Sequence, residues 1–140
     1  MPNRHAFTLI ELVVVVLVIG ILAAVATPRM SDLTRDAKDS SLRQSLETLR
    51  DAIEFYRFHN KAYPGGAGTE ASLKADLKAY LRAFPKNPIK DSDVVSVQTS
   101  GVAITGTITG GAGWIYDNRS GQIVANSNGT AGDGSRYFQW

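Results

Sequence analysis

Residues 7–28 read FTLIELVVVVLVIGILAAVATP, and this apolar stretch decides the fold. In a helix that rises about 1.5 Å per residue, a stretch of this length crosses a hydrocarbon core roughly 30 Å thick. It contains one charged side chain, Glu11, and no Lys or Arg that could pair with it. A carboxylate inside a bilayer costs about 2.5–3.5 kcal/mol even on lenient scales, so such a charge is normally paired and functional. We therefore expect residues 7–28 to span a membrane and Glu11 to find its partner outside its own helix.

A short polar segment, MPNRHA at residues 1–6, precedes this stretch and carries Arg4 and His5 but no acidic residue. By the positive-inside rule, this basic end stays in the cytoplasm and the remainder of the chain is exported. The sequence therefore predicts a single-pass protein in which residues 29–140 form a domain outside the cytoplasm.

The leader and the apolar stretch together resemble the start of type IV pilins and of the pseudopilins of type II secretion. The resemblance rests on the block FTLIEL at residues 7–12, with Gly20 and Pro28 at the spacings of that family. It implies that an aspartyl prepilin peptidase cuts between Ala6 and Phe7 and methylates the new amine of Phe7. Family members prefer Gly before the cut, whereas this chain has Ala, which is small enough for processing to survive.

Cleavage would give Glu11 a partner, because it leaves on Phe7 an α-amine whose ordinary pKa is near ~7.7–8.0. Pairing within one chain is conceivable over about one helical turn. Pairing between chains is more useful, since it neutralises the carboxylate only when one subunit docks on another. Leaving a buried charge unpaired costs several kcal/mol, so the pair of Glu11 and a neighbouring Phe7 would set the register of assembly.

Gly20 and Pro28 are the weak points of the apolar helix. Relative to Ala, Gly costs about 1 kcal/mol and Pro about 3 kcal/mol in a helix interior. Local propensity alone favours a kink. In filaments of the family the equivalent segment is unwound, so the resemblance implies a helix break at Gly20 and Pro28.

The resemblance implies that the chain is a structural subunit and not an enzyme. It would polymerise into a periplasmic pseudopilus that drives protein export by type II secretion. Its implied partners are copies of itself, minor pseudopilins, an inner-membrane assembly platform, the prepilin peptidase and the inner (cytoplasmic) membrane, with the exported domain periplasmic or extracellular. The alternative within the family is a type IV pilin that forms a surface pilus for adhesion, motility or DNA uptake.

A secretory signal peptide is the alternative from another class of protein. Basic residues precede the apolar stretch, and residues 24–26, AVA, fit a signal peptidase site. A chain of that class would be a secreted or periplasmic binding domain. The charge of Glu11 inside the stretch, and a length beyond the ~7–15 residues of such signals, favour the prepilin interpretation.

The composition argues against two further classes of function. The formal net charge of +2 gives no electrostatic case for a nucleic acid partner. The chain has no cysteine, so no disulfide can close the exported domain. With only His5 and His59, and without a zinc, nucleophile or phosphate-loop motif, the sequence offers no catalytic constellation.

Residues 29–60 continue with a helical period. No Pro or Gly interrupts residues 30–60, so one helix can extend from about residue 7 to about residue 59. Leu33 and Ala37 extend its apolar stripe toward the N-terminus. The stripe itself consists of Leu42, Leu46, Leu49, Ile53 and Tyr56. Charged residues occupy the other side, so later segments must cover the stripe.

The C-terminal half predicts a short helix and a sheet. Residues 63–66, YPGG, end the long helix, and a second helix follows over residues 69–83 with Thr69 as its N-cap. Apolar alternation then predicts an antiparallel sheet over residues 94–126. Its expected strands are 94–99, 102–109, 113–117 and 122–126. The predicted fold class is α+β and pilin-like, with a long N-terminal membrane-spanning helix packed through its C-terminal half on the short helix and the sheet.

The C-terminal loop, residues 127–140, is rich in Gly, Asn and Ser and lacks periodicity; we call it the tail. The order of features before it resembles the major pseudopilin of type II secretion, whose loop after the last hairpin holds calcium. The resemblance implies a calcium site here. Its side chains would be Asn126, Ser127, Asn128, Asp133 and Asp117. Calcium takes 6–8 oxygen ligands with several carboxylates among them, and Asp133 is the only acid in the tail, so a plain Gly-rich loop with Asx turns is the alternative. No other cofactor is expected.

Processing provides the first test. We expect a prepilin peptidase to cut after Ala6, since the scissile bond precedes the apolar stretch on its cytoplasmic side. Mass spectrometry of the assembled protein should find methylated Phe7 at the N-terminus, and Ala6→Gly should leave processing intact or speed it. A mature N-terminus at Thr27 would instead indicate a secretory signal peptide, and an intact Met1 in filaments would contradict leader cleavage.

Overall fold

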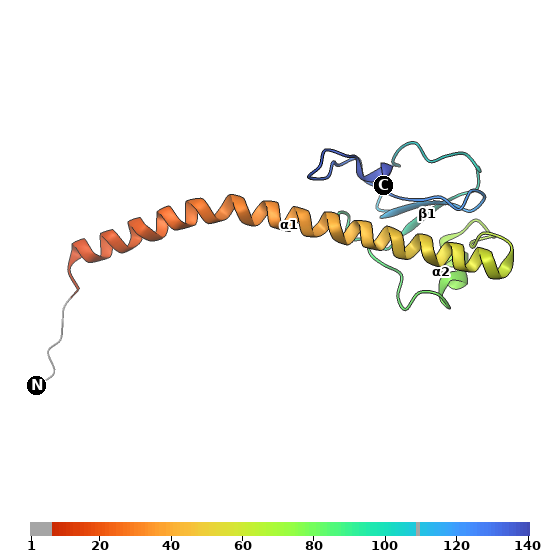
Figure 1. Ribbon diagram of the computed structural model, residues 1–140, viewed down its shortest axis with the longest axis horizontal. Helices are drawn as coiled ribbons and strands as arrows, with labels where there is room; N and C mark the ends of the chain where they lie inside the picture. Colours follow the sequence, from red (N-terminus) through yellow and green to blue (C-terminus); the bar gives the residue numbers. More distant parts are fainter. Residues whose placement is uncertain (1–6, 109) are drawn as a thin grey trace, which may run out of the picture. The chain divides into compact units, whose positions relative to one another are not determined.

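The computed structural model describes residues 7–108 and 110–140, without the side chains of residues 26–29 and 31. The chain divides into an N-terminal unit, Met1–Arg35, and a C-terminal unit, Asp36–Trp140. The architecture is α+β, with a long helix followed by a short helix, a small sheet and a single-turn 3-10 helix (Figure 1).

One helix, α1 at Leu9–Asn60, confirms the prediction of a single long helix. Its backbone continues through Gly20 and Pro28 without a break, so the unwinding expected from the resemblance stays a prediction about filaments. In the N-terminal unit, the exposed fractions of the large apolar side chains that the structure describes run from 48% at Val18 to 82% at Leu9. Among the described residues, no helix has the length and hydropathy that a membrane span requires.

The C-terminal unit is built on the apolar stripe of α1. Four of the five predicted stripe residues are buried, from Leu42 to Ile53, and Tyr56 is half-buried beside them. They pack with Leu73 and Leu77 of the second helix and with side chains of the sheet. The predicted extension to Leu33 and Ala37 is wrong, since both side chains are exposed.

The second helix, α2 at Glu70–Leu77, begins as predicted and ends early. Thr69 is its N-cap, with the side-chain oxygen accepting a hydrogen bond from the amide of Ser72. The helix ends at Leu77 instead of residue 83. A turn follows, in which the amides of Tyr80 and Leu81 both donate to the Leu77 carbonyl. The side chains of Tyr80, Leu81 and Phe84, which follow the helix, pack partly buried on the core.

The sheet has three strands in the order β1-β2-β3. They are β1 at Val95–Gln98, β2 at Trp114–Asp117 and β3 at Ile123–Ala125. β2 and β3 form the predicted antiparallel hairpin, but β1 pairs with β2 in parallel, in the register Val95 to Trp114. The prediction of an antiparallel sheet over residues 94–126 is therefore wrong for one of its two pairs.

The predicted strand at 102–109 is absent from the described residues 102–108, which form a loop over one face of the sheet. Ile104 packs there on Ile115 and Val124, with Ile108 partly buried beside them. The amides of Ile104 and Ile108 donate to the side chains of Gln122 and Asn126, not to a neighbouring strand. The alternating apolar residues of this loop thus cover one face of the sheet. The loop also crosses over between β1 and β2, which explains why these two strands run parallel. Residue 109 lies outside the described residues.

A buried acid, Asp117, organises the end of the hairpin. One carboxylate oxygen accepts from the amides of Arg119 and Ser120, and the other accepts from the amide and hydroxyl of Ser100 and from the amide of Gly101, at 2.8–2.9 Å. Burial by itself raises the pKa of this carboxyl, but the hydrogen bonds from Ser120, Ser100 and their neighbours outweigh burial and hold the pKa well below its ordinary value.

We expect Asp117→Asn to destabilise the C-terminal unit by about 2–3 kcal/mol, because an amide nitrogen cannot accept and leaves buried donors unpaired. The folded pKa lies below the unfolded value near ~3.9, so the carboxylate stabilises the fold above about pH 4 and this contribution is lost as the pH falls. Thermal melts of the full chain in detergent across this pH range measure both effects. Asp91→Asn replaces an exposed carboxylate beside Lys86 and is the control. It should change neither the stability of the unit nor its dependence on pH. Equal acid sensitivity of Asp117→Asn and the wild type would contradict this role.

Candidate functional site

The N-terminal end of α1 holds Glu11 in a capping box. The backbone amide and the hydroxyl of Thr8 both donate to one carboxylate oxygen of Glu11, at 3.0 and 2.9 Å. In return the amide of Glu11 donates to the Thr8 hydroxyl oxygen at 3.3 Å, and the Thr8 carbonyl accepts the first helical bond, from Leu12. This reciprocal arrangement satisfies helix amides that have no partner within the helix.

Thr8 was not among the residues predicted from the sequence to act with Glu11. The pattern Thr8-Leu9-Ile10-Glu11 is the T-x-x-E signature of a capping box, and it stands directly before the apolar run. The charge of Glu11 predicted a partner outside its own helix, with pairing to the Phe7 amine of the same chain or of another chain both open. The structure shows that, before any subunit docks, the carboxylate has a neutral partner in its own first turn.

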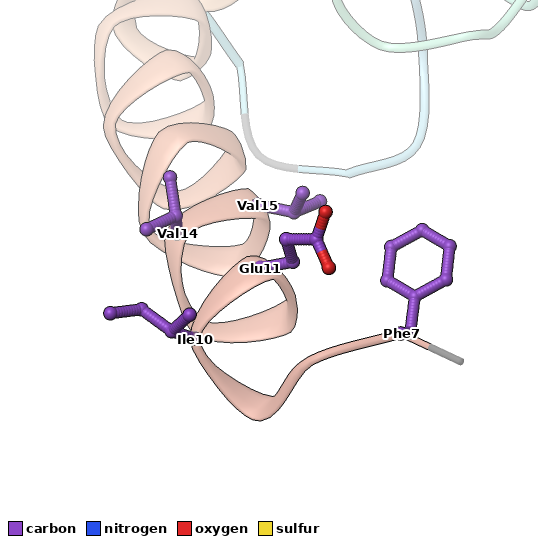
Figure 2. A pocket seen from close by; sticks show the side chains of 5 residues that line it. All are labelled: Phe7, Ile10, Glu11, Val14 and Val15. Carbon is purple, nitrogen blue, oxygen red and sulfur yellow. The ribbon is translucent and has the colours of Figure 1, made fainter. Parts of the chain in front are cut away.

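Figure 2 shows the surroundings of Glu11. A shallow hollow of about 310 Å³ is lined by Phe7, Ile10, Glu11, Val14 and Val15. The carboxylate points to the same side of the helix end as the Phe7 ring, whereas Ile10 and Val14 lie on the other side (Figure 2). Every one of these side chains is exposed, and Glu11 makes no ion pair among the residues that the structure describes. A carboxylate bound only by neutral donors, on an apolar surface, keeps its full charge available to a cation from another molecule.

Phe7 is described and exposed by 79%, whereas Ala6 lies outside the described residues. The cleavage and methylation at Ala6 and Phe7 therefore stay predictions. The pairing of Glu11 with the Phe7 amine of another subunit also stays a prediction, since it concerns the processed chain.

The residues proposed for calcium are spread over several hydrogen-bond networks. The side-chain oxygen of Asn126, which is fully buried, accepts from the amide of Ile108, and its amide group donates to the Ala112 carbonyl. Ser127 accepts from the amide of Gly129. Asn128 is exposed. The oxygens of Asp117 are saturated at the far end of the hairpin, as described above.

Asp133, the one acid of the tail, already holds a cation. One of its oxygens accepts from Arg43 at 2.6 Å, and the other accepts from the amide and hydroxyl of Ser135. The hydrogen bonds from Ser135, followed by the guanidinium of Arg43, hold the pKa of this carboxyl below its ordinary value. A Ca²⁺ ion would need to displace Arg43 and gather further carboxylates, and no group of three or more acids, histidines or cysteines suited to a metal occurs among the described residues. The side chains as arranged do not fit calcium, and the site stays an untested prediction.

Comparison with known proteins finds one family model and several relatives. Residues 1–27 match the family model of the prokaryotic N-terminal methylation motif. The type II secretion system core protein G of Pseudomonas aeruginosa is 37% identical over 90 residues, which cover 64% of this chain and 61% of that protein. The core protein G of Klebsiella pneumoniae is 28% identical over 102 residues, covering 63% and 71%. A fimbrial protein of Neisseria meningitidis is 32% identical over 96 residues, covering 66% and 56%. No solved structure matches this chain.

These matches confirm the resemblance to the pilin and pseudopilin family, and to the major pseudopilin within it. The matched segment spans less than two thirds of the Pseudomonas relative. The family model covers the leader, the capping box and most of the apolar stretch, so the N-terminal end of α1 belongs to the part of the chain that matches the methylation motif.

The capping box can be tested by itself. Thr8→Val removes the hydroxyl that accepts from Glu11 and donates to it, so we expect the first turn of α1 to lose about 1 kcal/mol of local stability. Thr8→Ser keeps the hydroxyl and is the matched control. Amide hydrogen exchange of the full chain in detergent should be faster for the first turn in the valine variant and unchanged in the serine variant. Equal exchange in both variants would show that the box adds nothing there.

Proposed function

We propose that the chain is the major subunit of a type II secretion pseudopilus and that it works by polymerising. Residues 7–28 carry one acidic side chain, Glu11, and the large apolar side chains described there form an exposed surface. In the proposed filament, the apolar helices of neighbouring subunits pack together and remove this surface from water or lipid. The C-terminal unit, with its own core, faces outward.

One observation carries this proposal. The large apolar side chains of the N-terminal unit that the structure describes are 48% or more exposed, and some of them surround a carboxylate whose hydrogen bonds come from Thr8. Exposed apolar surface of this extent marks a membrane or protein contact. An acid inside such a surface is costly unless a cation meets it there, and a processed Phe7 amine of a second copy supplies that cation.

The proposed cellular arrangement follows from the same segment. Before assembly, residues 7–28 anchor the subunit in the inner membrane, with residues 1–6 in the cytoplasm and residues 29–140 exported. A prepilin peptidase removes the leader and methylates Phe7. The assembly platform then draws subunits from the membrane into the filament, and minor pseudopilins join it. During that step the helix unwinds between Gly20 and Pro28, where the propensity for helix is lowest.

A surface pilus is the second candidate function. The similarity to the fimbrial protein of Neisseria meningitidis supports it, since that match covers 66% of this chain. Both candidates share the leader, the methylated Phe7 and the role of Glu11. The location of the filament separates them, because a pseudopilus stays in the periplasm whereas a pilus leaves the cell.

The decisive experiment replaces Glu11 in cells that process and assemble the chain. Glu11→Ala removes the acid, so insertion and cleavage should continue, but each Phe7 amine would enter the filament core without a counter-charge at a cost of about 3–5 kcal/mol. We expect filaments of the pure variant to fail, as counted by electron microscopy, while mass spectrometry still finds processed subunits. Glu11→Gln should behave nearly like Ala, and co-expression with wild type should restore part of the filaments.

Thr8→Val separates pairing from capping. This variant loses the capping box but keeps the carboxylate of Glu11, so we expect it to assemble into filaments. If Thr8→Val fails as completely as Glu11→Ala, Glu11 acts as a cap within its own helix. Should processed Glu11→Ala subunits form filaments of normal length and number, pairing between subunits is wrong.

A further inference from the structure

Two side chains one turn apart on α1 hold the tail. Asp39 is almost fully buried, and its two oxygens accept from the hydroxyl of Tyr137 at 2.7 Å and from the amide of Gly132 at 2.8 Å. Arg43 follows four residues later, so it lies on the same side of the helix. Its guanidinium reaches Asp133 at 2.6 Å. Asp39 and Arg43 of α1 therefore bind neighbouring residues of the tail.

Arg43 also closes a ring of contacts within the tail. Its guanidinium carbon lies 4.0 Å from the centre of the Trp140 ring, which is a cation–π contact. The indole nitrogen of Trp140 donates to the hydroxyl oxygen of Ser135 at 2.7 Å, and that hydroxyl donates to Asp133. Each member of the ring thus contacts the next, and the ring returns to Arg43.

Trp140, a member of this ring of contacts, is held by further contacts with Arg50 and Tyr137. Arg50, two turns along α1 from Arg43, donates to the carbonyl oxygens of Trp140 and Ile123 and so ties the tail to β3. The Trp140 ring stands edge-on to that of Tyr137, with 5.1 Å between the ring centres. The tail is held by polar side chains of one helix and by the edge-to-face contact of two aromatic rings.

We propose that the Arg43 guanidinium takes the place of a calcium ion in this tail, so that the chain closes its C-terminal loop with its own cation. Asp133 has a positive charge beside it whether that charge is a calcium ion or the Arg43 guanidinium. Here the protein supplies it, together with donors that a metal lacks and a flat face that stacks on Trp140. A calcium ion at Asp133 would meet the fixed charge of Arg43, and of the two α1 acids beside Gly132, Asp36 and Asp39, the second has both oxygens occupied. The tail consequently stays closed at any calcium concentration, and this holds whether or not the chain forms the proposed filament.

The ion pair of Arg43 and Asp133 is by itself too weak to keep the tail closed. The side chains of Arg43 and Asp133 are each 53% exposed, and exposed pairs contribute little. The coupling to Trp140 and Ser135 makes the difference, because loss of Arg43 removes the ion pair and the stacking together. The charge should therefore matter less than the planar guanidinium, and Lys at this position should restore only part of the effect.

Hydrogen–deuterium exchange of the full chain in detergent tests this, read on peptides from residues 128–140 in millimolar calcium and in chelator. We expect the wild-type tail to exchange at the same rate in both. Arg43→Gln should speed the exchange of the tail roughly five- to tenfold in both, with Arg43→Lys in between. Asp133→Asn should speed exchange in the same peptides, and combining it with Arg43→Gln should add little, since both break one ring.

Arg57→Gln is the matched control. Arg57 lies on the same helix, pairs with Glu54 at 3.3 Å and stacks on Tyr63 at 4.7 Å, away from the tail. Its loss should leave exchange in the tail unchanged. Calcium that slows exchange of the wild-type tail, or raises the melting temperature of the wild type, would overturn the proposal. An Arg43→Gln tail as protected as the wild type would overturn it as well. If Arg43→Gln also speeds exchange in peptides of β2, the variant has loosened more than the tail. Asp133→Asn leaves α1 unchanged and then decides: faster exchange in the tail peptides supports the proposal, and unchanged exchange there overturns it.

Discussion

The apolar side of α1 must be shielded from water, and the rest of the structure depends on how this is done. In the C-terminal unit, α2, the sheet and the tail cover the stripe from Leu42 to Ile53 completely. In the N-terminal unit, the described chain covers none of the large apolar side chains. Under the proposed function, a membrane covers them first and other copies of the chain cover them later. The same physical requirement thus produces a folded core in one unit and an assembly surface in the other.

The core itself is small, and polar side chains carry much of its organisation. The sheet has short strands, so many loop amides lack a strand partner and need another acceptor. Asp117, Asn126 and Asp39 supply these acceptors for the loops around the hairpin and for the tail. This explains why a domain without disulfides can hold a Gly-rich tail in one place. It also explains why these buried polar side chains are sensitive positions, since each has several partners.

Glu11 has one role in the described structure and a second role in the proposed filament. In the described structure its carboxylate caps the first turn of α1 together with Thr8. In the proposed filament it meets a cationic amine of another copy. A capped carboxylate is fixed in position by neutral donors, which leaves its charge uncompensated and its geometry preset for a cation. The capping box would therefore prepare the acid for pairing and would not compete with it.

The sequence by itself determined the elements whose signals are local. The single helix Leu9–Asn60, its buried stripe, the Thr69 cap and the hairpin of β2 and β3 follow from periodicity, capping residues and turn residues, which act over a few positions. The T-x-x-E pattern of Thr8 and Glu11 is an equally local signal, although the capping box was not predicted. Three features become visible only in the tertiary structure. They are the parallel pairing of β1, the packing of residues 102–108 on one face of the sheet and the ion pair of Arg43 with Asp133. Those features join residues far apart in the chain, and an alternating apolar pattern is the same whether a segment pairs with a strand or lies across a sheet.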